Sequence, residues 1–134
     1  MIRLKPYLEI ARFEFLVFTF AVASVPVSLS VLTGDFSPTN TAVATLLFLF
    51  SHIGVNSINV ASDYRRGIDE DTEETPFSGG VDTLTAGKAS YTTARNMGML
   101  SVLASAVLFV WFVWLYGVFF SHASASEKPA VDSA

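Results

Sequence analysis

The stretch MGMLSVLASAVLFVWFVWLYGVFF, from Met97 to Phe120, contains no Asp, Glu, Lys or Arg. A membrane-spanning helix needs about 20 consecutive, mostly apolar residues, so this stretch is long enough to cross a bilayer. It ends in Trp111, Trp114 and Tyr116, residue types that favour the membrane–water interface. Two further stretches meet the same requirement, at about residues 13–32 and 41–62. We therefore expect an all-α integral membrane protein with three transmembrane helices.

The composition agrees with this class. Of the 134 residues, 51% are hydrophobic and 15% are charged, whereas about 25% of a soluble domain is charged. The net charge of −4 argues against a nucleic-acid partner. The absence of Cys excludes disulfides, thiolate metal sites and Cys nucleophiles.

The first span resembles a signal peptide only in its position. A signal peptide has an apolar core of about 7–15 residues. Here the apolar run is longer, and Pro6, Glu9 and Arg12 precede it, so a retained span is the favoured interpretation. Pro26 lies inside this span and is expected to kink it.

Basic residues predict the orientation. They precede the first span or lie between the second and third, at Arg3, Lys5, Arg12, Arg65, Arg66, Lys88 and Arg95; the remaining one, Lys128, lies near the C-terminus. The positive-inside rule then assigns the N-terminus and the loop 63–95 to the cytoplasm. We expect the turn 33–40 and a polar, disordered tail at 121–134 to face outward across the cell membrane.

The second span carries polar residues at helical spacing. His52, Asn56, Asn59 and Asp63 are four, three and four residues apart, which places them on one stripe of a helix. Such residues can be hydrogen-bonding glue between spans. A stripe that becomes more polar toward one end and finishes in a carboxylate favours a functional cavity, with His52 and Asn56 lining it.

The stripe leads into a strongly acidic segment. Asp69, Glu70, Asp71, Glu73 and Glu74 follow Asp63 closely. Carboxylate and amide oxygens suit Mg²⁺, which binds through one or two carboxylates together with substrate phosphate. For residues 70–74 alone a solvated acidic loop is the favoured interpretation. Asn59, Asp63 and Asp69 are the predicted metal ligands.

The run Asn59-Val-Ala-Ser-Asp63-Tyr-Arg-Arg-Gly67-Ile-Asp69, followed by Phe77-Ser-Gly-Gly80, resembles the first aspartate-rich motif of the UbiA-type intramembrane prenyltransferases. The menaquinone-pathway and archaeal branch is the most similar. The resemblance covers nearly all of residues 5–120, and Val60 departs from it where many members carry Asp. It implies that the three helices correspond to the first part of a multi-helix bundle.

This resemblance implies a function. Members transfer a prenyl group from an allylic prenyl diphosphate to an aromatic or other lipid acceptor, with Mg²⁺ held by Asn and Asp side chains. Asp63 and Asp69 would be the catalytic residues, and Asn59, Arg12 and Lys88 would bind diphosphate. For Arg12 a positive-inside anchor is an equal alternative, and for Lys88 a topology or phospholipid charge is the favoured one.

The family also carries a second aspartate-rich motif, and no second carboxylate cluster of that kind follows Gly80. We expect the chain alone not to be a competent transferase, and to need self-association or a second subunit with further helices. The rival hypothesis is a non-catalytic membrane subunit, or a truncated homologue, that binds diphosphate or metal or packs against partner helices.

Overall fold

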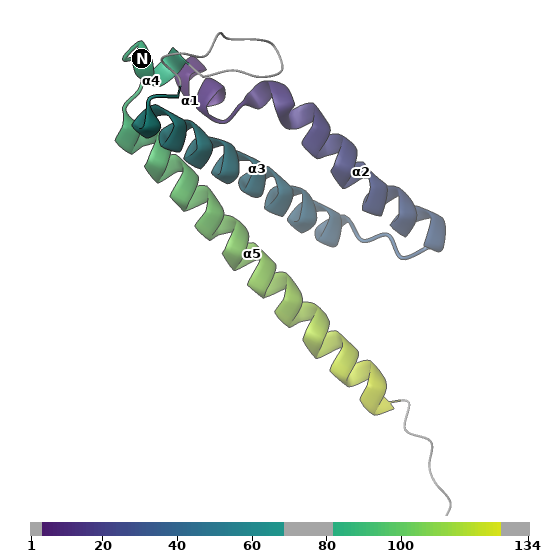
Figure 1. The fold of residues 1–134 in the computed structure, drawn as a ribbon. Coiled ribbons are helices and arrows are strands. Elements are labelled where there is room, and N and C mark those ends of the chain that lie inside the picture. Colours follow the sequence, from purple (N-terminus) through teal and green to yellow (C-terminus); the bar gives the residue numbers. More distant parts are fainter. Residues whose placement is uncertain (1–3, 69–81, 127–134) are drawn as a thin grey trace, which may run out of the picture.

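The computed structural model describes residues 4–68 and 82–126, with side chains as far as Leu115. These residues form helices and no strands, and three of the helices are long and apolar enough to span a membrane. They are α2 (Leu16–Thr33), α3 (Pro38–Arg66) and α5 (Tyr91–Ser126) (Figure 1). A 3-10 turn, η1 (Phe13–Phe15), precedes α2. The predicted fold class is confirmed.

The α2–α3 hairpin is closed by residues with specific backbone preferences. Gly34 ends α2 at φ +80°, a left-handed conformation that glycine adopts readily. Ser37 caps α3, its Oγ accepting from the Asn40 N–H at 3.3 Å, and Pro38 occupies the first turn. At the other end of α3, Gly67 takes the left-handed C-cap at φ +72°. Inside the hairpin, α2 continues through Pro26 without interruption.

Helices α3 and α5 are antiparallel neighbours that touch at two glycines. A Cβ on Gly54 would lie 3.1 Å from the Val102 backbone nitrogen, and a Cβ on Gly98 would lie 3.0 Å from that of Ile58. Small residues allow such an approach in membranes, where close packing replaces the hydrophobic effect as the source of helix association. A hydrogen bond between the hydroxyls of Ser51 and Ser105, 2.7 Å apart, continues the same contact.

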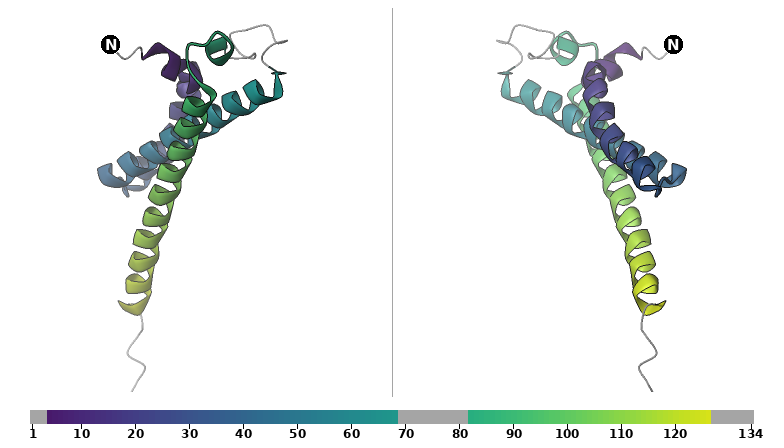
Figure 2. Two further views of the ribbon diagram at one scale, coloured as in Figure 1. Left: turned by 90° about the vertical axis from the view of Figure 1, so that its left-hand side faces the viewer. Right: turned by 90° about the vertical axis from the view of Figure 1, so that its right-hand side faces the viewer.

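Helix α5 is longer at both ends than the span predicted at 97–120. It begins at Tyr91, where Ser90 Oγ accepts from the Thr93 N–H and so caps the helix. It continues to Ser126, since the Ser and Ala residues after Phe120 include no helix breaker. Residues 127–134 of the predicted tail lie outside the described part. The C-terminal half of α5 extends well beyond α2 and α3 (Figure 2).

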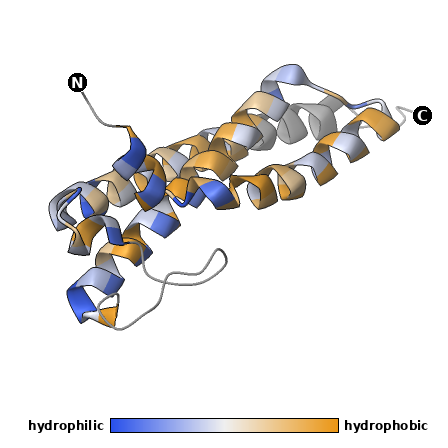
Figure 3. Cartoon of the chain, turned by 90° about the horizontal axis from the view of Figure 1, so that it is seen from above, coloured by the Kyte–Doolittle hydropathy of each residue, from blue (hydrophilic) through white to orange (hydrophobic). Residues whose placement is uncertain are grey.

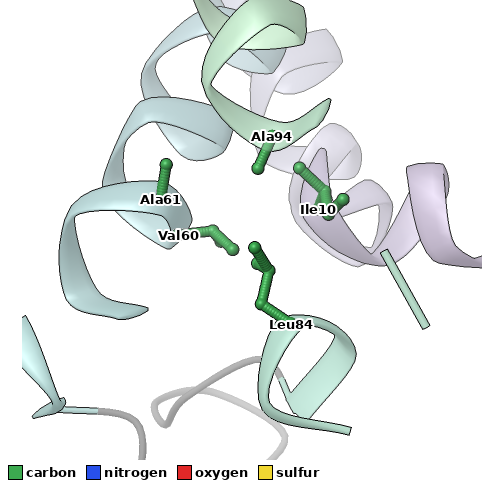
Figure 4. Close-up of a cluster of buried hydrophobic side chains, with 5 residues drawn as sticks. All are labelled: Ile10, Val60, Ala61, Leu84 and Ala94. Carbon is green, nitrogen blue, oxygen red and sulfur yellow. The ribbon is translucent and has the colours of Figure 1, made fainter. Parts of the chain in front are cut away.

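Two short helices cover one end of the bundle, and neither was predicted. They are α1 (Lys5–Ile10) and α4 (Asp82–Thr85). Ile10 of α1 and Leu84 of α4 are buried against Val60, Ala61 and Ala94 (Figure 4). This small core fixes both helices over the end of α3 and the start of α5.

The surface has the polarity of a membrane protein. Large apolar side chains are exposed along the three long helices, with Leu32 at 84% and Leu100 at 68%. Hydrophobic colours dominate these helices, and strongly hydrophilic ones gather toward the end that carries α1 and α4 (Figure 3). Within the described ranges, all Lys and Arg residues lie toward that end, which we call the basic end: Lys5, Arg12, Arg65, Arg66, Lys88 and Arg95.

Candidate functional site

The polar stripe of α3 lies away from the contact with α5. Helix α3 is continuous from His52 to Asp63, so the four stripe residues share one side of it. The residues that α3 buries are Gly54, Ser57, Val60 and Ala61. At 3.6 residues per turn, the stripe lies about 140° around the helix from this buried face. Its residues are therefore open to α2 or to the surroundings of the bundle.

His52 joins three parts of the chain. Its Nδ1 lies 2.8 Å from the Thr19 hydroxyl on α2, and its Nε2 lies 3.3 Å from the backbone oxygen of Arg12. The side chain is half-buried in a shallow groove between α2 and α3. The groove is lined by Phe18, Thr19, Val22, Phe48, Ser51, His52, Val55 and Asn56. His52 and Asn56, predicted to line a cavity, both line this groove.

One N–H group of the Asn56 side chain donates a hydrogen bond within α3. Its Nδ2 donates to the backbone oxygen of His52, one turn earlier, at 2.9 Å. This bond satisfies one of the two amide N–H groups within the same helix, and leaves the other N–H and Oδ1 of Asn56 for other partners.

Asn59 and Asp63 are the predicted metal ligands that the structure describes. Asn59 is exposed and Asp63 is half-buried; both lie on the same side of α3, one turn apart, just before the helix ends at Arg66. Among the described residues, no hydrogen bond or ion pair engages either side chain. The third predicted ligand, Asp69, lies outside the described residues. An amide oxygen and a carboxylate fit a Mg²⁺ ion that keeps several waters.

No group of three His, Asp or Glu side chains that could hold a metal occurs within residues 4–68 and 82–115. Two other acidic residues near the basic end, Glu9 and Asp82, have partners of their own. Glu9 accepts a hydrogen bond from the Thr83 hydroxyl and lies 3.5 Å from Lys5 Nζ. Of the three predicted ligands, the described part of the chain therefore contains two, Asn59 and Asp63.

The two predicted phosphate-binding cations have different surroundings. Arg12 is half-buried, and its guanidinium lies 5.8 Å from the centre of the Phe15 ring, within the range of a cation–π contact. Lys88 Nζ lies 3.0 and 3.1 Å from the two carboxylate oxygens of Asp82. The carboxylate of Asp82 therefore offsets the charge of Lys88.

Sequence reasoning missed two residues of this region. Thr19 is a polar residue between Phe18 and Phe20 in the first span. A polar side chain between two aromatic ones in a span indicates a hydrogen-bond partner on another helix, which here is His52. Thr83 is fully buried and holds α4 on α1 through Glu9. No sequence pattern indicated that bond, because it joins residues 74 positions apart.

No protein-family model, no curated protein and no solved structure matches this chain.

Proposed function

We propose that this chain is a membrane prenyltransferase of the UbiA type, or the N-terminal part of one. It would transfer a prenyl group from an allylic prenyl diphosphate to an aromatic or other lipid acceptor, with Mg²⁺. The observation that carries the proposal is the position of Asn59 and Asp63. They lie on the side of α3 that α5 does not cover, at the end of the helix that leads into the acidic segment resembling the family motif.

The role proposed for each residue follows from the chemistry of its side chain. Asn59 and Asp63, with Asp69, would hold Mg²⁺, which neutralises the charge that develops on a departing diphosphate. Arg12 would contact the diphosphate oxygens directly, as a guanidinium matches phosphate geometry well. Lys88 would join it only by exchanging the carboxylate of Asp82 for phosphate.

The apolar groove between α2 and α3 supports the proposal, because an allylic cation would need surroundings with little water. Phe18, Val22, Phe48 and Val55 line it beside His52. A prenyl chain along this groove would be shielded from water, which otherwise captures the cation.

The exposure of Asn59 supports a partner. A polar amide that faces lipid is costly, and intramembrane polar residues normally face a bundle interior. A second copy of the chain, or another polypeptide with further helices, would cover this side of α3. The exposure of Asn59 also fits the rival function, a non-catalytic membrane subunit that packs its stripe against partner helices.

A mass-spectrometric assay separates the two functions. Native membranes, which contain the full chain together with any second subunit, are incubated with Mg²⁺, prenyl diphosphates of several lengths and a panel of quinone precursors. The transferase proposal predicts a prenylated acceptor that disappears with EDTA and with the Asp63→Asn variant. Mg²⁺-dependent diphosphate binding without any product would favour the non-catalytic subunit.

A further inference from the structure

The backbone turns sharply at Arg12, between α1 and η1. Among the described residues, Arg12 is the only non-glycine residue with a positive φ, at +49°. An L-residue pays a steric cost in this left-handed region, so surrounding contacts must hold it there. The corner also sets the direction in which the Arg12 side chain leaves the backbone.

The carbonyl of Arg12 accepts two hydrogen bonds. One comes from the Phe15 N–H at 2.9 Å and belongs to the turn itself. The other comes from His52 Nε2 at 3.3 Å, from a helix 40 residues away in the sequence. A carbonyl oxygen can only accept, so Nε2 must carry the hydrogen.

This assignment also determines whether the other ring nitrogen, Nδ1, donates or accepts. In a neutral imidazole with hydrogen on Nε2, Nδ1 is an acceptor. The Thr19 hydroxyl, 2.8 Å away, then donates to it. The ring is therefore held at both nitrogens, between α2 and the Arg12 corner. The apolar groove around it strengthens both bonds, because water competes poorly there.

We infer that His52 is a positioning residue. By holding the left-handed corner at Arg12, it sets the place of the Arg12 guanidinium relative to a diphosphate that Asn59 and Asp63 would bind through Mg²⁺. The inference rests on the proposed function for its ligand. It differs from a plain helix–helix contact, because the bond from His52 ends on the backbone of a phosphate-binding residue.

Replacements at His52 distinguish these roles. His52→Gln retains a donor near the position of Nε2, whereas His52→Leu removes both bonds. Ser105→Ala is the matched control, since it removes a hydrogen bond between α5 and α3, the one to Ser51, and Ser105 does not line the groove. The full chain in lipid nanodiscs is titrated with geranylgeranyl diphosphate in the presence of Mg²⁺.

We expect His52→Leu to weaken binding about tenfold, the effect of losing a partly buried hydrogen bond that positions a charge. His52→Gln should stay within about threefold of the wild type, and Ser105→Ala should bind as the wild type does. In an Arg12→Ala background, His52→Leu should cause no further loss, because the two residues act through one contact. The inference would be overturned if His52→Leu weakened binding as much in the Arg12→Ala background as in the wild type. It would also be overturned if His52→Gln bound the diphosphate as weakly as His52→Leu.

A second readout is independent of the ligand. The chain has no Cys, so spin labels can be placed at Leu8→Cys on α1 and Leu46→Cys on α3, both partly exposed. The distance distribution between them should broaden in His52→Leu and stay narrow in His52→Gln. If the wild-type chain binds no diphosphate, the proposed function fails, while an unchanged distribution in His52→Leu would reject the corner-holding role itself.

Discussion

Replacing Gly54 by Ala should separate α3 from α5. The new Cβ would lie 2.7 Å from Val102 Cγ2, 3.1 Å from the Val102 nitrogen and 3.3 Å from the Gly98 oxygen. The Val102 methyl group can rotate away, but the two backbone atoms cannot. Since carbon atoms pack at about 3.5–4.0 Å, α5 must retreat by roughly half an ångström. Such a gap forfeits a quarter or more of each dispersion contact nearby, and overpacking of this kind costs about 1–3 kcal/mol.

A disulfide provides the assay for this separation. The hydroxyls of Ser51 and Ser105 are 2.7 Å apart, and the chain contains no other thiol source. The double variant Ser51→Cys, Ser105→Cys should therefore cross-link rapidly under mild oxidation in a bilayer. Adding Gly54→Ala should slow the reaction about tenfold, in line with the packing cost.

The control adds a carbon atom where there is room. Val55 is 55% exposed, so Val55→Ile should leave the cross-linking rate unchanged. Gly54→Ala cross-linking as fast as Val55→Ile would refute the close approach of the helices. So would a double-cysteine chain that does not cross-link at all.

Two further predictions concern orientation and the basic end. A reporter fused after Ala134 should be active only if it functions outside the cytoplasm, and cytoplasmic activity would contradict the N-in, C-out topology that the Lys and Arg distribution predicts. Thr83→Val should release α4 from α1 by breaking the hydrogen bond to Glu9, at a cost of about 1–2 kcal/mol. Proteolysis after Lys88 should then be faster than in the control Thr85→Val, which removes a hydrogen bond within α4, to the Asp82 backbone oxygen; equal rates would show that the bond between Thr83 and Glu9 does not hold α4.

The sequence was sufficient for the long helices because their signals are local. Each span is an apolar run longer than a bilayer requires. Gly34, the Ser37-Pro38 pair and Gly67 mark helix ends through their own backbone preferences. The short helices α1 and α4 escaped prediction for the opposite reason. Helices of this length are marginal alone, and here they depend on the burial of Ile10 and Leu84 against other elements.

The same difference between local and long-range signals applies to the candidate site. The spacing of His52, Asn56, Asn59 and Asp63 predicted a shared face, and the unbroken helix α3 places them on one. Their partners could not be predicted. Thr19 and the Arg12 carbonyl reach His52 from 33 and 40 residues away, which requires knowing how α2 lies against α3. The roles assigned to these residues, and to Asp69, stay predictions.

The central claim is that Asn59 and Asp63 hold Mg²⁺ for a diphosphate, and one binding measurement tests it most directly. The full chain in nanodiscs is titrated with geranylgeranyl diphosphate, with and without Mg²⁺, as wild type, Asp63→Ala and Glu73→Ala. The account predicts Mg²⁺-dependent binding that Asp63→Ala abolishes and Glu73→Ala leaves nearly unchanged, since Glu73 belongs to the stretch interpreted as a solvated loop. Equal losses in both variants would contradict this expectation and show that the acidic segment acts only as a diffuse patch of charge. Binding that is indifferent to Mg²⁺ would contradict the claim that a metal ion joins the diphosphate to Asn59 and Asp63.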